Sequence, residues 1–151
     1  MITCKFEDGG NAELRHVVVD GIILNAAHDS ILLTKRAPHL TNGGKYGLIG
    51  GYLDRDETCE LGMLRELMEE TGYEGRVIEL FKVVDTPNRR NEDRQNVTFV
   101  YIVEAGDKVG EPDDESTEIR WHNLNGMPRE EEFAFDHYEI ITMYLKARTG
   151  H

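Results

Sequence analysis

The sequence is poor in cysteine, and the two cysteines that it contains lie far apart. Cys4 and Cys59 form no CxxC pair, and two cysteines are too few to build a disulfide framework in a chain of 151 residues. This scarcity argues against a disulfide-stabilised fold. It also argues against a structural zinc site.

Long apolar runs are absent as well. No stretch approaches the roughly eighteen apolar residues that a membrane-spanning helix needs. The first ten residues, MITCKFEDGG, lack the basic segment followed by an apolar run that marks a secretory signal. We therefore expect a cytoplasmic protein without a membrane partner.

Positive charge is scarce too, with 17 Lys and Arg against 29 Asp and Glu and a formal net charge of -12. Such a surface argues against a nucleic-acid partner. It would also repel a phosphate-bearing substrate unless bound divalent cations offset the charge. Hydrophobic residues make up 39% of the chain, which is enough for a core. The length predicts one domain spanning residues 1–151.

Apolar, β-branched runs bounded by polar or glycine-bearing segments predict the strands. Gly50 and Gly51 interrupt one such run, YGLIGGYL, which indicates that backbone must come close to another group there. The predicted strands cover residues 16–24, 30–34, 46–53, 77–84, 97–104 and 118–122, and a closing helix runs from about residue 137 to 148.

A central helix is predicted from about residue 56 to 71. Asp56 or Thr58 can cap its first turn, and Gly72 follows its last residue as a stop signal. Strands on both sides of this helix, with a second helix at the end of the chain, predict an α/β fold. In this fold a mixed sheet is covered by helices on both faces.

Three carboxylates share one face of the central helix. Glu66, Glu69 and Glu70 stand at i, i+3 and i+4, within roughly a 100° arc. The opposite arc is predicted to face the core and contains Leu61, Leu64, Leu67 and Met68. The three glutamates could form a solvated acidic face, but like charges at this spacing repel. Hard cations such as Mg²⁺ prefer oxygen ligands and would turn the repulsion into binding.

The segment around these glutamates, GYLDRDETCELGMLRELMEETGY from Gly51, resembles the Nudix box of the Nudix hydrolases. Five residues separate Gly51 from Glu57, and seven more precede the motif Arg-Glu-Leu-x-Glu-Glu-x-Gly, which ends at Gly72. The one departure is Tyr73, where an aliphatic residue is usual. Flanking segments, among them GKYGLIGG, EIRWHNLNGMP and FAFDH, are similar to those of the same family.

The resemblance implies the family's α/β/α sandwich and a Mg²⁺-dependent site, in which Mn²⁺ can substitute. The box would bind the metal and the diphosphate of a small nucleotide substrate. Glu66 would be a ligand or the base that activates water, Glu57 would bind a second metal or hold Arg65, and Arg65 would orient the glutamates. The implied metal site comprises Gly51, through its carbonyl, and Glu57, Glu66, Glu69 and Glu70.

The general base is not fixed by the box, because the family recruits it from different places. Glu115 and Glu118 are the candidates outside the helix, although each could instead belong to an exposed acidic turn. Arg36 and Lys45 could contact phosphate or could be ordinary surface cations.

The substrate class rests on segments outside the box. Pro87 and the arginine-bearing stretch DTPNRRNEDRQNVTFVY resemble a loop of ADP-ribose hydrolysing members, and FAFDH is similar to a segment of the same enzymes. Arg89, with Arg90 and Arg94, would contact phosphate or ribose oxygens. Asp136 would accept hydrogen bonds from the base or ribose, or would cap the final helix.

We therefore expect hydrolysis of ADP-ribose or a related nucleoside diphosphate sugar. Two alternatives are a pyrophosphohydrolase that acts on nucleoside triphosphates and a non-catalytic, nucleotide-sensing Nudix domain. The intact box and the net charge of -12 argue against the sensing domain, which usually carries a DNA-binding partner domain. The sequence is compatible with a homodimer.

Overall fold

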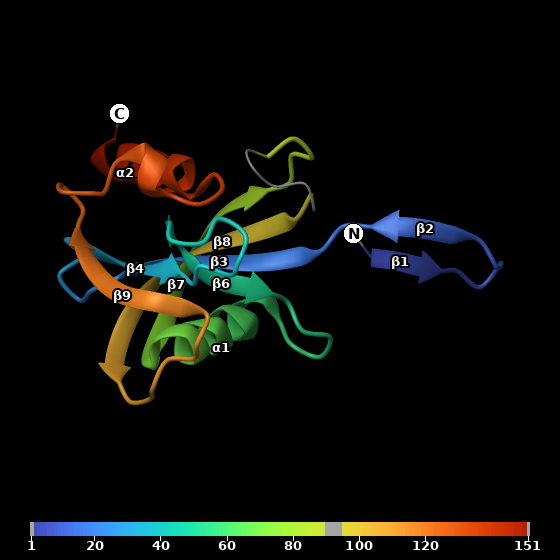
Figure 1. The fold of residues 1–151 in the computed structure, drawn as a ribbon, viewed down its shortest axis with the longest axis horizontal. Helices are drawn as coiled ribbons and strands as arrows, with labels where there is room; N and C mark the ends of the chain where they lie inside the picture. The colour runs from blue at the N-terminus through green and yellow to red at the C-terminus, as the bar shows by residue number, and fades with distance from the viewer. Residues whose placement is uncertain (1, 90–94, 151) are drawn as a thin grey trace.

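The computed structural model describes residues 2–89 and 95–150 of the chain (Figure 1). Its helices are α1 (Cys59–Thr71) and α2 (His137–Thr149), with a single 3-10 turn, η1 (Glu130–Glu132). Its strands are β1 (Ile2–Lys5), β2 (Asn11–Leu14), β3 (Val17–Leu24), β4 (Ser30–Arg36), β5 (Tyr46–Gly47), β6 (Ile49–Tyr52), β7 (Tyr73–Val84), β8 (Val97–Lys108) and β9 (Ser116–Asn123).

Seven strands form one mixed sheet with the central order β5-β4-β3-β8-β7. β3 and β8 run parallel, from the pair Val17 and Val97 to the pair Leu24 and Glu104. The other pairings in this sheet are antiparallel, including those of β6 with β3 and of β9 with β4. The predicted mixed sheet is confirmed.

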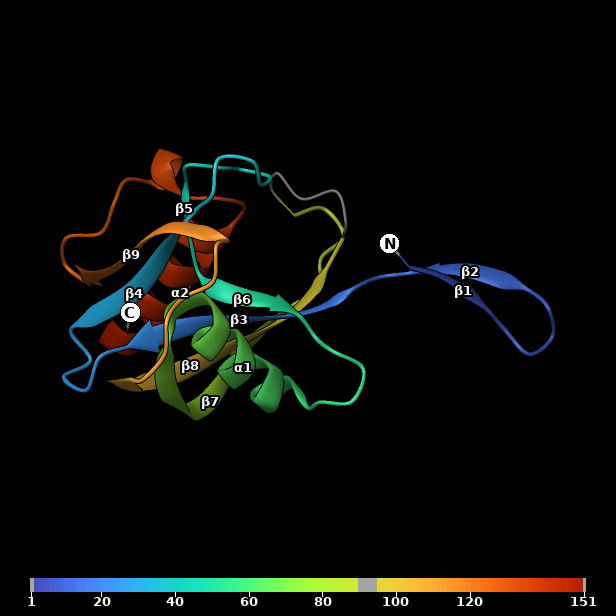
Figure 2. The same cartoon turned by 60° about the horizontal axis from the view of Figure 1, so that its bottom comes forward.

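Each face of the sheet carries its own core, because successive side chains of a strand point to opposite faces. On one face Val19 and Ile23 of β3 pack with Met63 and Leu67 of α1. On the other face Ile22 and Leu24 pack with Ile140, Ile141 and Tyr144 of α2. Figures 1 and 2 show the two helices on opposite sides of the sheet, as the α/β/α sandwich predicts.

The ends of α1 follow from its sequence, and its predicted core-facing side is confirmed for Leu67 but not for Leu61. The hydroxyl of Thr58 accepts a hydrogen bond from Leu61 N, and Gly72 ends the helix in the left-handed region at φ 74°. Leu61, expected in the core, is 59% exposed, whereas Met63 is fully buried. A Cβ on Gly21 of β3 would lie 2.9 Å from Met63 Sδ. The missing side chain at Gly21 therefore lets Met63 enter the core.

The sequence did not predict the hairpin of β1 and β2, which projects from the body of the protein (Figure 2). Ile2 pairs with Leu14 across it, and both side chains are more than 40% exposed. β7 and β8 are also longer than predicted, because they continue to pair beyond the core as far as Tyr73 and Lys108. Among the described residues, no helix has the length and apolar character needed to cross a membrane.

Candidate active site

The guanidinium of Arg65 connects the carboxylates of the box. Its Nη2 and Nε donate to the two oxygens of Glu57 at 2.7 and 3.0 Å. Its Nη1 donates to Glu66 at 2.8 Å and to Glu69 at 2.9 Å. Its Nη2 also donates to the carbonyl of Tyr52 at 3.0 Å. Glu57 thus holds Arg65, and Arg65 fixes the directions of two further carboxylates.

Two glycines let α1 approach β6 closely. A Cβ on Gly51 would lie 2.5 Å from Glu66 Oε1, so no larger residue fits without moving that carboxylate. The backbone N–H of Gly50 donates to Glu70 Oε1 at 2.8 Å. The sequence prediction that backbone comes close to another group at Gly50 and Gly51 is therefore confirmed.

The helical spacing places the three glutamates on one face of α1, but they are not equally exposed to solvent. Glu69 is exposed, Glu66 is partly buried, and Glu70 is only 7% exposed. Glu70 is buried because α1 lies close against β6, where Gly50 receives its carboxylate. The alternative of a solvated acidic face is therefore wrong for Glu70.

Burial governs the proton affinity of two of these carboxylates. It raises the pKa of Glu66, although the hydrogen bond from Arg65 opposes the shift. It raises the pKa of Glu70 well above the ordinary value, against the opposing hydrogen bond from Gly50. The hydrogen bond from Arg65 instead lowers the pKa of Glu57. At both Glu66 and Glu70, burial therefore outweighs the hydrogen bond that stabilises the ionised carboxylate.

The loop between β8 and β9 brings Glu115 to the box. Asp113 N donates to the carbonyl of Glu69 at 2.8 Å, which ties the loop to the end of α1. Ala37 N donates to the carbonyl of Glu115 at 2.9 Å, which ties it to the end of β4. Glu115 lines the same pocket as Glu66 and contributes to raising its pKa.

Glu118, the other candidate base, lies elsewhere. It accepts a hydrogen bond from Tyr46 Oη at 3.2 Å and does not line the pocket. Its neighbours in β9 alternate between the faces of the sheet, and Tyr46 belongs to the core on the α2 side. The structure therefore brings only Glu115 of this pair to the box.

A pocket of about 430 Å³ extends from the box across the end of the sheet. Gly51, Arg65 and Glu66 form its box side. The other walls come from β3, β4, the segment around β6, β8 and the residues that precede and begin α2. Its lining includes Val18, Asp20, Arg36, Leu40, Leu48, Arg89, Asn96, Thr98, Phe135 and His137.

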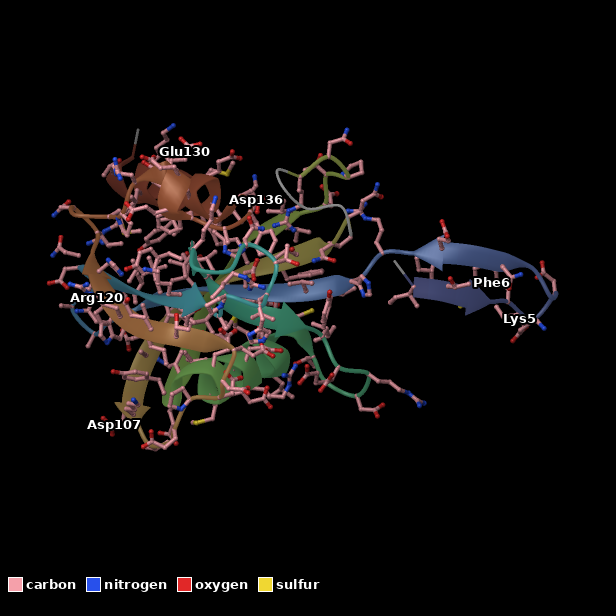
Figure 3. The ribbon with its side chains drawn as sticks, viewed as in Figure 1. Lys5, Phe6, Asp107, Arg120, Glu130 and Asp136 are labelled. Atoms are coloured by element: carbon pink, nitrogen blue, oxygen red, sulfur yellow. The ribbon has the colours of Figure 1, made fainter. Side chains whose placement is uncertain are left out.

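Arg89 and Asp136, both predicted to bind substrate, bind each other. Arg89 Nε and Nη2 donate to the two carboxylate oxygens at 2.9 and 2.7 Å, and both side chains are more than 90% buried. Arg89 also lines the pocket and donates to Thr98 Oγ1. Asp136 precedes α2 (Figure 3), but its side chain makes no capping hydrogen bond, so the capping alternative is wrong.

Asp20 and His137 were not identified from the sequence. Asp20 is 5% exposed and lies 3.8 Å from His137 Nε2 through its Oδ2. Burial raises the pKa of Asp20 to about 7, with Arg89 opposing the shift. A single acidic residue inside the apolar run VVVDGIIL was the available signal for Asp20. No local pattern linked it to His137, 117 positions later.

The two cations predicted to contact phosphate have different positions. Arg36 lines the pocket, where its guanidinium stacks 5.1 Å from the ring centroid of Phe135 and donates to the carbonyl of Thr41 at 2.8 Å. Lys45 lines a separate cavity of about 30 Å³. Arg90 and Arg94 lie outside the described residues.

The predicted ligands are not preassembled around an ion. Within residues 2–89 and 95–150, no three His, Cys, Asp or Glu side chains converge as a metal-binding group. The Arg65 guanidinium occupies the space between Glu57, Glu66 and Glu69. A cation would have to share these carboxylates with Arg65.

Comparison with known proteins agrees with this arrangement. The family model described as NUDIX domain matches residues 14–144. An ADP-ribose pyrophosphatase of Methanocaldococcus jannaschii is 35% identical over 136 residues, covering 89% of this chain and 75% of the relative. A putative 8-oxo-dGTP diphosphatase 3 of Mycobacterium tuberculosis is 32% identical over 120 residues, and this chain spans 55% of its length.

Among solved structures, one similar chain is a bifunctional NMN adenylyltransferase/ADP ribose pyrophosphatase of Francisella tularensis complexed with AMP and a Mn ion. It superposes with a TM-score of 0.70 at 25% identity, and the match covers 90% of this chain and 42% of that one. The family match, the intact box and the geometry around α1 agree. The chain belongs to the Nudix family and is a Nudix hydrolase.

Proposed function

We propose that this Nudix hydrolase cleaves the diphosphate bond of ADP-ribose or a closely related nucleoside diphosphate sugar, with Mg²⁺ as its cofactor. The observation that carries the proposal is a single pocket with the box at one side and a buried polar floor at the other. The floor is formed by Asp20, Arg89 and His137. A substrate with groups on both sides of the diphosphate requires contacts of both kinds. The similarity to an ADP-ribose pyrophosphatase supports the same substrate class.

The residues around Gly51 fit a divalent cation. Glu66 and Glu70 are carboxylates whose burial raises their pKa, so a cation beside them would stabilise the ionised forms. Both are hard oxygen donors of the kind that Mg²⁺ prefers. When bound, the ion would neutralise diphosphate oxygens and lower the pKa of water. We propose Glu69 and the Gly51 carbonyl as further ligands.

Glu115 is the proposed general base. Its carboxylate lines the pocket beside Glu66, from a loop held by backbone hydrogen bonds to α1 and β4. There it would accept a proton from the water that attacks phosphorus. Arg65 holds Glu66 and Glu69 in position during this step.

The decisive experiment pairs Glu115→Gln with Glu118→Gln. The first variant should lower kcat roughly 100-fold or more, as expected for loss of a general base, while Mg²⁺ affinity changes little. The second should stay near wild type, because Glu118 bonds Tyr46 away from the pocket. Equal activity of both variants, with activity lost only in Glu66→Gln, would place the base on α1.

The substrate class is tested with a panel in Mg²⁺ buffer: ADP-ribose, nucleoside diphosphate sugars, dinucleoside polyphosphates, and normal and oxidised nucleoside triphosphates. We expect ADP-ribose to give AMP and ribose 5-phosphate at the highest kcat/KM. Similarity to a putative 8-oxo-dGTP diphosphatase makes triphosphate hydrolysis the second candidate. Pyrophosphate release from a triphosphate, with ADP-ribose untouched, would favour that candidate.

A further inference from the structure

The floor of the pocket holds a carboxylate that the proposed hydrolysis does not use. Asp20 is 5% exposed and lies on the same face of β3 as Val18 and Ile22. No hydrogen bond to its carboxylate is found within the described ranges, and His137 Nε2 lies 3.8 Å from it, beyond hydrogen-bonding distance. Buried carboxylates normally receive hydrogen bonds. This one lines the pocket, so a bound ligand can supply them.

Hydrogen-bond donors lie next to this acceptor. Leu48 N donates to His137 Nδ1 at 3.0 Å, so Nδ1 carries a lone pair. The proton of the neutral ring is therefore on Nε2, the nitrogen that faces Asp20. The guanidinium of Arg89 lines the same pocket. The floor thus presents a strong acceptor and donors within one small region.

The charge of the floor is unsuited to a phosphate. Arg89 is neutralised by its paired hydrogen bonds to Asp136, at 2.9 and 2.7 Å. Asp20, when ionised, adds a negative charge that Arg89 and the partly exposed Arg36 oppose only in part, since burial outweighs both. A second anion there would be repelled. A neutral ligand group that both donates and accepts hydrogen bonds is favoured, and a hydroxyl group has this property.

The position of Asp20 relative to the box indicates which hydroxyl groups these are. A Cβ on Gly50 would lie 2.6 Å from Asp20 Oδ1, and one on the next residue, Gly51, would lie 2.5 Å from Glu66 Oε1. Asp20 is therefore one residue of β6 away from Glu66, one of the carboxylates proposed to bind the cation that would hold the diphosphate. In a nucleoside diphosphate sugar, a ribose follows the diphosphate directly and the base lies beyond it.

We propose that Asp20, with His137 and Arg89 beside it, binds the vicinal hydroxyl groups of the ribose next to the scissile diphosphate. This inference rests on the proposed function, since it names the substrate group that the floor of the pocket binds. ADP-ribose carries a ribose on each side of the diphosphate. The floor takes one of them, and the test below identifies which.

The test measures binding by titration calorimetry in Mg²⁺ buffer, so that no turnover is needed. The probes are AMP with 2′-deoxy-AMP, for the adenosine ribose, and ribose 5-phosphate with 2-deoxyribose 5-phosphate, for the terminal ribose. In the wild type, one pair should show the ribose form binding about 10-fold or more tighter, the effect of a hydrogen bond to a charged group. Asp20→Ala should reduce that ratio to about threefold or less.

Asp20→Asn, which is nearly isosteric, supplies the variant if Asp20→Ala does not fold. Asp107→Asn is the matched control, because Asp107 is exposed, does not line the pocket and lies on β8 far from Asp136 (Figure 3). Equal binding of both members in both pairs by the wild type overturns the proposal. A ribose preference that persists in both Asp20 variants overturns it too.

These outcomes are independent of the substrate panel. A protein that hydrolyses only triphosphates, but loses a ribose preference on replacement of Asp20, would retain this subsite and refute the proposed substrate. A protein that hydrolyses ADP-ribose without distinguishing ribose from deoxyribose would show the reverse.

Discussion

The two sides of the pocket contain similar ionic groups in opposite settings. On the box side, Arg65 and the glutamates of the box come from a stretch of fourteen residues, 57–70, and Glu69 has half of its side chain exposed. At the floor, Arg89 is paired with Asp136 from a distant part of the chain, and the two side chains are 4% and 9% exposed. The first group is local in sequence and partly exposed, whereas the second is long-range and buried.

The two ionic groups are suited to different roles, the box side to catalysis and the Arg89–Asp136 pair to stability of the fold. On the box side an excess of carboxylates surrounds one arginine, an arrangement that favours cation binding over folding. On the floor, one arginine and one aspartate satisfy each other, and removal of either leaves a buried charge without its partner. We therefore expect box substitutions to affect turnover and substitutions in the Arg89–Asp136 pair to affect unfolding.

The largest expected effect tests the box side. Glu70→Gln should lower kcat about 100-fold or more, because several kcal/mol of charge stabilisation is lost with a cation ligand. The melting temperature in metal-free buffer should not fall, since a neutral side chain replaces a buried carboxylate. Glu60→Gln, on the exposed first turn of α1, is the control and should remain active. Full activity of a folded Glu70→Gln variant would contradict the ligand assignment.

The second effect tests the floor. Arg89→Ala should destabilise the fold by about 3–5 kcal/mol, because Asp136 is left buried and charged. Urea denaturation measures this change. Arg129→Ala, which removes an exposed arginine beside Glu131 and Glu132, should change stability by less than about 1 kcal/mol. Equal stability losses in the two variants would show that burial does not distinguish the two ion pairs.

A smaller effect depends on pH. Burial raises the pKa of Asp20 from 3.8 to about 7. Between these two pH values its carboxyl group is mostly protonated in the folded chain and mostly ionised in the unfolded chain. Stability from this site is present below about pH 4 and is lost as pH rises toward 7. The amide introduced by Asp20→Asn does not titrate. The melting temperature of this variant relative to wild type, in metal-free buffer, should therefore be higher at pH 8 than at pH 5.

The smallest effect concerns the start of α1. Thr58→Ala removes the hydroxyl that accepts the hydrogen bond from Leu61 N and should cost about 1 kcal/mol. Thr58→Ser keeps the cap and should be close to wild type. A large loss of kcat in Thr58→Ala at unchanged stability would instead show that the cap sets the direction of α1, on which the box depends, rather than the stability of the fold.

The box could be predicted from sequence because its geometry is helical. Glu66, Glu69 and Glu70 are related by one turn of α1, so their spacing alone places them together. The burial of Glu70 could not be predicted in this way. It depends on β6, whose Gly50 lies against the helix and donates to the carboxylate.

Only part of the floor and its surroundings could be predicted from the sequence. Arg89 and Asp136 were both selected as polar residues with a role, but each was assigned a separate contact with substrate. Their mutual pairing requires the segment before β8 and the start of α2 to meet over one face of the sheet. Asp20 was overlooked because one acidic residue in a predicted strand has no periodic pattern. Its role depends on the pocket around it, whose other walls include residues of β4, β6 and α2.

The parallel pairing of β3 with β8 has a consequence for synthesis of the protein. Val17 pairs with Val97, and the offset of 80 residues is kept to Leu24 and Glu104. At about 5–20 residues per second, a ribosome needs roughly 4–16 s to produce the intervening chain. During that interval one edge of the highly apolar β3 has no partner and can pair with another nascent chain. The chain is therefore most prone to aggregate before β8 has left the ribosome.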